Sequence, residues 1–137
     1  MDVIQFSIDP QLKKTSHRLI ELKLSKVRLV DDARWPWLLV IPRVPLAVEL
    51  IDVPPKLRSQ IWLEVDHVSQ VIRDVFSPYK LNVAALGNQV RQLHVHVIAR
   101  FSEDDAWPNP IWGVGAAVSY EPGVLRARLN VLRRAFS

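Results

Sequence analysis

The first part of the chain alternates polar and apolar residues in the manner of β-strands. Residues 19–24 place an apolar side chain at every even position, while Glu21 and Lys23 occupy odd positions. This period of two predicts a strand with one buried face. We expect a tight connection near residues 25–26 and a second strand through residues 27–29.

A continuous apolar run follows, with the sequence WPWLLVIPR at residues 35–43. A run of this length without alternation is typical of a central strand that is buried on both faces. Pro42 and Pro45 end it. Residues 47–53, AVELIDV, are a further candidate for a short strand.

Three segments have the pattern of helices. Asp9 and Pro10 form a typical helix start, an N-cap followed by proline, which here supports only a short helix. After Pro54, apolar residues recur at steps of three and four and predict one amphipathic helix of about twenty residues. These residues are Leu57, Ile61, Val65, Val68, Ile72 and Val75. Residues 121–136 predict a C-terminal helix with a leucine-rich face.

Between the two longer helices, the pattern predicts two more strands and an ordered loop. Residues 80–86 and 90–100 have strand character, and residues 86–89 form a turn between them. Residues 101–115 are rich in tryptophan and proline, which indicates an ordered loop. Strands, helix, two strands and terminal helix with short connections predict a single α+β domain over residues 1–137, built on a mainly antiparallel sheet.

Composition limits the possible chemistry. The chain has 137 residues, of which 49% are hydrophobic and 23% charged, as in an ordinary soluble domain. It contains no cysteine, which excludes disulfides, thiolate nucleophiles and cysteine-ligated metals. No long apolar run and no signal-peptide layout are present, so we expect a cytoplasmic protein without a membrane partner.

The net charge of +4 favours an anionic partner only weakly. Four arginines lie in the last twelve residues, namely Arg126, Arg128, Arg133 and Arg134. Without them the charge is close to balanced. We interpret them as the solvated face of the terminal helix, and we do not expect nucleic-acid binding.

The most informative stretch is QLHVHVIAR at residues 92–100. On a strand, Gln92, His94 and His96 would share one face, because side chains alternate between faces. Two imidazoles and an amide there could form a metal site, a catalytic site or polar filler. A zinc site would require a third ligand from elsewhere, and no ligand cluster flanks the strand.

The surroundings favour a phosphate site. The turn of Gly87, Asn88 and Gln89 allows backbone N–H groups to approach an anion closely. Arg100 would add a positive charge near the strand end. An imidazole is also a competent nucleophile at phosphorus, because a useful fraction of it is unprotonated at neutral pH.

These residues resemble the signature of the histidine triad (HIT) superfamily, His-φ-His-φ-His-φ-φ, where φ is hydrophobic. WLLVIPR resembles the central strand of that family, LNVAALGNQV its phosphate loop, and AWPNPIWG a C-terminal segment of a bacterial branch. The resemblance covers about residues 17–113, in the expected order.

The resemblance implies a five-stranded sheet that pairs with a second copy in a homodimer. It also implies hydrolysis or transfer of nucleotidyl groups, with a purine nucleotide or nucleotide conjugate as partner. Substrates would be nucleoside phosphoramidates or dinucleoside polyphosphates. We expect no resident cofactor, beyond a divalent cation that can accompany polyphosphate substrates.

The resemblance also assigns roles to residues. His94 corresponds to the nucleophile, and His96 to the histidine that helps to bind phosphate oxygens. Asp32, or Asp31 as a second candidate, corresponds to the acidic residue that binds the ribose hydroxyls. The phosphate contacts correspond to Asn82, Gly87, Asn88 and Gln89, with Arg100 added from its charge.

One position departs from the family signature. Gln92 stands where the first triad histidine would be, and glutamine cannot titrate. We expect the nucleophile to survive; the alternative is a nucleotide-binding protein without significant turnover. Of the tryptophans, Trp35 or Trp37 is a candidate for lining a base pocket, and Trp107 and Trp112 for covering the site or the dimer edge.

Overall fold

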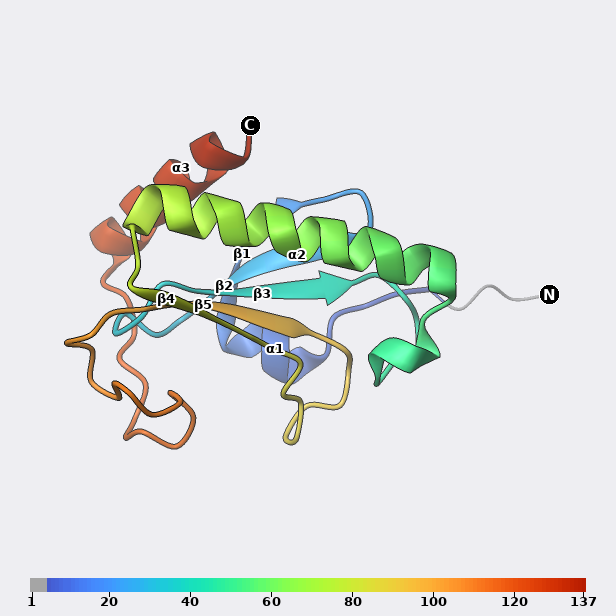
Figure 1. Ribbon diagram of the computed structural model, residues 1–137, viewed down its shortest axis with the longest axis horizontal. Coiled ribbons are helices and arrows are strands. Elements are labelled where there is room, and N and C mark those ends of the chain that lie inside the picture. Colours follow the sequence, from blue (N-terminus) through green and yellow to red (C-terminus); the bar gives the residue numbers. More distant parts are fainter. Residues whose placement is uncertain (1–4) are drawn as a thin grey trace.

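The computed structural model describes residues 5–137, which form an α+β domain around one antiparallel sheet (Figure 1). The sheet has five strands in the order β1-β2-β3-β5-β4, and every neighbouring pair is antiparallel. The strands are β1 (Ser16–Glu21), β2 (Ser25–Val30), β3 (Trp37–Pro42), β4 (Lys80–Ala84) and β5 (Val95–Arg100). The predicted fold class is therefore confirmed.

Three α-helices and one 3-10 turn complete the domain. They are α1 (Pro10–Lys14), the 3-10 turn η1 (Leu50–Asp52), α2 (Pro55–Phe76) and α3 (Pro122–Phe136). Asp9 caps α1 as predicted, because its Oδ1 accepts a hydrogen bond from the backbone N–H of Gln11 at 2.8 Å. The described part of the chain contains no helix that is both long and apolar enough to cross a membrane.

One face of the sheet packs the main core, and the other carries the candidate site. Helix α2 lies along one face, with α3 packed beside it, whereas α1 and the long loops lie on the opposite face (Figure 1). Alternation along β5 sends Val95, Val97 and Ala99 into the main core beneath α2. His96, Ile98 and Arg100 consequently face the side of α1 and the loops. This second face carries the candidate site.

Two predictions about local structure in the first half of the chain were wrong. Residues 47–53 form no strand: the Asp52 carboxylate accepts hydrogen bonds from the N–H groups of Val48 and Glu49 and stabilises the η1 turn instead. The turn between β1 and β2 lies at residues 22–24, earlier than predicted. Glu64 of α2 fixes it there by accepting from the N–H groups of Leu24 and Ser25, both at 2.8 Å.

Strand β5 begins at Val95, five residues later than predicted. The preceding segment leaves the sheet, and the N–H of Leu93 donates to the carbonyl of Ala47 at 3.0 Å. Gln92 is therefore outside the strand. The expectation that it shares a strand face with the two histidines is wrong.

Candidate functional site

A cavity of about 670 Å³ opens on the face of the sheet opposite α2. Its walls come from α1, from the ends of β2 and β3, from the 86–90 loop and from residues 111–119. Of the predicted site residues, it is lined by Asp31, Asp32, Gly87, Asn88, Gln89, His94 and His96. The structure therefore brings together segments that are up to about a hundred residues apart in the sequence.

The neutral ring of His94 is held in one tautomer by its neighbour. Its Nδ1 lies 2.6 Å from the backbone carbonyl of Gln92. A carbonyl can only accept a hydrogen bond, so Nδ1 carries the proton and Nε2 of the neutral ring keeps its lone pair. Within residues 5–137, Nε2 makes no hydrogen bond. This is the arrangement that a histidine nucleophile requires.

His96, in β5, is fixed at both ring nitrogens. The indole N–H of Trp37 donates to Nδ1 at 3.0 Å, and Nε2 donates to the carbonyl of Leu86 at 2.8 Å. An indole nitrogen is only a donor, so the ring is neutral with its proton on Nε2. Burial lowers the pKa of His96 from 6.5 to about 4, which keeps this form at neutral pH.

The hydrogen bond from His96 to the carbonyl of Leu86 also positions the phosphate-loop candidates Gly87, Asn88 and Gln89. His96 holds the carbonyl of Leu86, and Gly87 follows directly. A Cβ atom at Gly87 would lie 2.8 Å from the carbonyl oxygen of Val90 and 3.5 Å from Cε1 of His94. Glycine is needed here because the loop approaches its own backbone and the His94 ring so closely.

The ribose candidates are both present, but each already has partners. Asp32 is buried and pairs with Arg34, whose guanidinium donates to both carboxylate oxygens at 2.9 and 2.8 Å. Asp31 accepts from the N–H of Tyr120 at 3.0 Å and lies 3.2 Å from the imidazole of His17. Sequence reasoning missed Arg34, although its i, i+2 spacing from Asp32 was a visible signal.

Of the four candidate tryptophans, two contact His96 and two do not. Trp37 lines the cavity and donates to His96, while Trp112 meets the His96 ring edge-on at a centroid distance of 5.2 Å. Trp35 is fully buried in a separate cluster. Trp107 packs against Tyr79 instead. Trp37 is therefore the one of the two base-pocket candidates that reaches the cavity.

Arg100 and Asn82 do not line the cavity. Arg100 is 1% exposed and forms a two-point ion pair with Asp104, with nitrogen–oxygen distances of 2.8 and 3.0 Å. The remaining hydrogen bond of its guanidinium is to Oδ1 of Asn82 at 2.8 Å. Ile98 separates this cluster from His96 along β5. Neither residue reaches the cavity, and the Arg100 guanidinium already donates to Asp104 and Asn82, so their phosphate contact stays a prediction.

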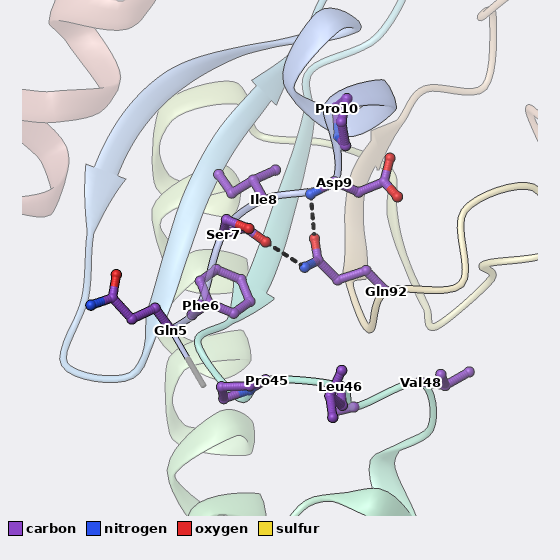
Figure 2. A pocket seen from close by; sticks show the side chains of 11 residues that line it. Gln5, Phe6, Ser7, Ile8, Asp9, Pro10, Pro45, Leu46, Val48 and Gln92 are labelled. Carbon is purple, nitrogen blue, oxygen red and sulfur yellow. Dashed lines mark hydrogen bonds between the residues drawn. The ribbon is translucent and has the colours of Figure 1, made fainter. Parts of the chain in front are cut away.

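Gln92 contributes only its backbone carbonyl to the histidines. Its side chain turns toward the N-terminal segment and lines a neighbouring hollow of about 410 Å³ (Figure 2). Among residues 5–137, no group of three or more histidine, aspartate or glutamate side chains is arranged to hold a metal ion.

Comparison with known proteins shows the family to which the chain belongs. The HIT domain family model matches residues 11–103. A histidine triad protein of Bradyrhizobium japonicum is 40% identical, with a TM-score of 0.95 over 98% of this chain and 100% of its own. A histidine triad protein of Marinobacter aquaeolei is 34% identical, with a TM-score of 0.94 over 96% of each chain. No curated protein matches significantly.

A more distant structure shows the same fold. It is a hypothetical histidine triad nucleotide-binding protein of Sulfolobus tokodaii, with 16% identity and a TM-score of 0.68 over 92% of this chain and 87% of its own. The family model covers well over half of the chain, and the predicted signature lies inside the matched range. The chain belongs to the histidine triad (HIT) family.

Proposed function

We propose that the protein is a nucleotidyl hydrolase or transferase in which His94 is the nucleophile. Members of the family are in general nucleotide-binding hydrolases and transferases. The observation that carries the proposal is the hydrogen bond from Nδ1 of His94 to the carbonyl of Gln92, at 2.6 Å. It leaves the Nε2 lone pair available in a residue that lines a nucleotide-sized cavity.

The reaction has two displacements at the α-phosphorus. Nε2 of His94 forms a P–N bond while the bond from phosphorus to the leaving group breaks, and the leaving group takes up a proton. A water molecule then attacks the same phosphorus and gives up a proton to the solvent, while the P–N bond breaks with return of its electron pair to Nε2 of His94 and the nucleoside monophosphate is released. Splitting one difficult displacement into two easier ones is the advantage of a covalent intermediate.

The neighbouring groups support this chemistry in different ways. Gly87, Asn88 and Gln89 line the cavity together with His94, so we assign them the contacts to the phosphate oxygens. His96 uses both ring nitrogens within the protein, so we assign it the task of holding this loop. Asp32 would bind ribose with a carboxylate that also pairs with Arg34, and Asp31 is the second candidate.

The proposed substrate class comes from the family resemblance and is compatible with the cavity and the nucleophile. We propose a purine nucleoside phosphoramidate or a dinucleoside polyphosphate, with the apolar wall of Leu39, Ile111 and Trp112 beside the base. Both substrates offer an α-phosphorus with a good leaving group.

The test is to incubate the protein with adenosine 5′-phosphoramidate and, separately, with diadenosine tetraphosphate. AMP release should be measured, and rapidly quenched samples should be digested and analysed by mass spectrometry. We expect an adenylyl group on the peptide that contains His94. AMP release that persists in a His94→Asn variant would sink the assignment.

The competing function is nucleotide binding without turnover. It is favoured by the placement of Gln92, whose side chain supplies nothing to the histidine cavity. This reading predicts AMP binding by calorimetry together with no AMP release and no adduct. The two functions are therefore separated by running the binding and turnover assays on the same preparation.

We also propose that the protein is a homodimer, joined edge to edge at β4. This strand is an outer strand of the sheet, and two apolar side chains at it are exposed, Tyr79 by 72% and Val83 by 43%. An exposed edge of this kind favours pairing with another strand. Light scattering coupled to size-exclusion chromatography should give twice the mass of the chain.

A further inference from the structure

The side-chain amide of Gln92 binds two backbone groups of the N-terminal segment. Its Oε1 accepts from the N–H of Asp9 at 2.9 Å, and its Nε2 donates to the carbonyl of Ser7 at 2.8 Å (Figure 2). The two bonds link residues more than eighty positions apart. They hold Ser7–Asp9 as a neighbouring strand would, because an amide side chain presents the same acceptor and donor as a peptide group.

This contact requires an amide. Ser7 offers an acceptor and Asp9 a donor on the same side of the extended chain, so the partner must supply one of each at one end of its side chain. A carboxylate has no donor, and its oxygen would face the Ser7 carbonyl. The two nitrogens of an imidazole point in different directions and cannot reach both groups together.

The segment held by Gln92 leads directly into one wall of the cavity. Asp9 caps helix α1, and Gln11, Leu12, Lys14 and Thr15 of this region line the cavity. A helix of five residues is not stable by itself, because nucleation costs more than so few hydrogen bonds return. The wall therefore depends on tertiary anchors at both of its ends.

Each end of α1 has such an anchor. At its C-terminal end, the buried Arg28 donates to the carbonyl of Lys13 at 3.2 Å and to that of Ser16 at 2.8 Å. At its N-terminal end, the anchor is the amide of Gln92. The apolar contact between these two points is Leu12, which is buried against Leu39 and Ile41 of β3.

The same residue also fixes the nucleophile. The backbone carbonyl of Gln92 accepts from Nδ1 of His94, while its side chain holds Ser7 and Asp9. Gln92 thus joins the histidine side of the cavity to the α1 side.

We propose that Gln92 is a positioning residue that holds α1 as a wall of the nucleotide cavity and so sets nucleotide affinity. This inference rests on the proposed function, since it identifies the cavity as the nucleotide site. The side chain of Gln92 does not contact His94 or His96. Its amide anchors Ser7 and Asp9 with two hydrogen bonds, which the histidine of the family signature cannot form together.

The test compares Gln92→Glu with Gln5→Glu. Both variants convert an amide to a carboxylate of the same size, and both residues line the same hollow. Calorimetry with AMP should show binding weakened about fivefold in Gln92→Glu, as expected for the loss of a hydrogen bond. Gln5→Glu should bind AMP as the wild type does.

Amide hydrogen exchange of the ligand-free protein reports whether the Gln92 amide stabilises Asp9 and α1. The amides of Asp9 and of α1 should exchange faster in Gln92→Glu than in Gln5→Glu, while α2 should be unchanged in both. Unchanged exchange of α1, or unchanged AMP affinity, in Gln92→Glu would overturn the proposal.

Kinetics with adenosine 5′-phosphoramidate separate positioning from chemistry. KM should rise about fivefold in Gln92→Glu, with kcat changed by less than about twofold, because the lost contact acts on binding. Gln92→His should show the same weakening and no gain in kcat. A fall in kcat at constant KM in Gln92→Glu, or a gain in kcat in Gln92→His, would contradict the proposal.

Failure of the proposed function can be recognised independently. A wild-type protein that binds AMP but releases none from either substrate would refute the hydrolase and leave the calorimetric and exchange tests of Gln92 intact. A wild type that binds AMP, with Gln92→Glu binding it equally well, would refute only the role of Gln92.

Discussion

Two polar clusters lie on the same side of the sheet, one where β5 begins and one where it ends, and only the first is free to act. His94 and His96 line an open cavity, and Nε2 of His94 is without a partner among residues 5–137. Two strand positions beyond Ile98, Arg100 is buried against Asp104 and Asn82. The residue types at both clusters suggested phosphate binding. The difference teaches that a polar side chain can serve a ligand only where part of its hydrogen-bonding capacity is left unused within the protein.

The buried cluster of Arg100, Asp104 and Asn82, here called the closed cluster, stabilises the loop that follows β5. The Asp104 carboxylate accepts from Arg100 and also from the N–H groups of Phe101, Ala106 and Trp107. Burial works to raise the pKa of Asp104, but these hydrogen bonds outweigh it and lower the pKa below its ordinary value. Arg100 and Asp104 therefore stabilise the segment that brings Ile111 and Trp112 to the cavity.

The largest expected effect is the loss of turnover in His94→Asn. Removal of the nucleophile should lower kcat by at least about 10³-fold, because no covalent intermediate can form. AMP affinity and thermal stability should stay close to those of the wild type. A variant that loses AMP binding as strongly as turnover would contradict the distinction between the open and the closed cluster.

The second prediction concerns the closed cluster. Asp104→Asn should lower the free energy of unfolding by about 3–5 kcal/mol, because it leaves the buried Arg100 without its counter-ion. Denaturant unfolding measures this, and the exposed neighbour Asp105→Asn is the matched control. The folded fraction of Asp104→Asn should still bind AMP. A stable Asp104→Asn variant with abolished binding would indicate that the closed cluster is part of the site after all.

The third prediction is a pH dependence of stability due to His96. Its pKa is about 4 in the folded protein and 6.5 without burial, so the unfolded chain binds the proton first. The stabilisation is complete above pH 6.5 and is lost as the pH falls toward 4, by up to about 3 kcal/mol. Unfolding measured across this range should show a shallower decline in His96→Asn. Equal slopes in the two proteins would mean that His96 titrates normally.

The smallest expected effect is that of Trp37→Phe. It removes the donor to Nδ1 of His96, which should cost about 1 kcal/mol and release the ring to exchange tautomers. Nitrogen-15 NMR of the imidazole should detect the second tautomer, and kcat/KM should fall about fivefold. Trp62→Phe, on the exposed surface of α2, is the control. An unchanged His96 tautomer would show that Leu86 alone fixes the ring.

Sequence patterns predicted most of the fold because the relevant forces are local and periodic. The apolar run at residues 35–43, the three-and-four repeat of α2 and the leucine face of α3 were all recognisable without tertiary contacts. The β1–β2 turn was misplaced because a carboxylate from α2 fixes it, and a residue forty positions away leaves no mark on the local pattern.

For the site, the sequence by itself determined which residues could carry chemistry: two histidines, a glycine-containing turn and two aspartates, in the order of the HIT signature. Only the tertiary structure decided which of them have free lone pairs. It assigned Arg100 to Asp104 and directed the Gln92 amide to the N-terminal segment, because buried hydrogen-bonding groups must find partners and those partners lie far away in the chain. Residue types limit the possible chemistry, but the distribution of hydrogen bonds decides where it can occur.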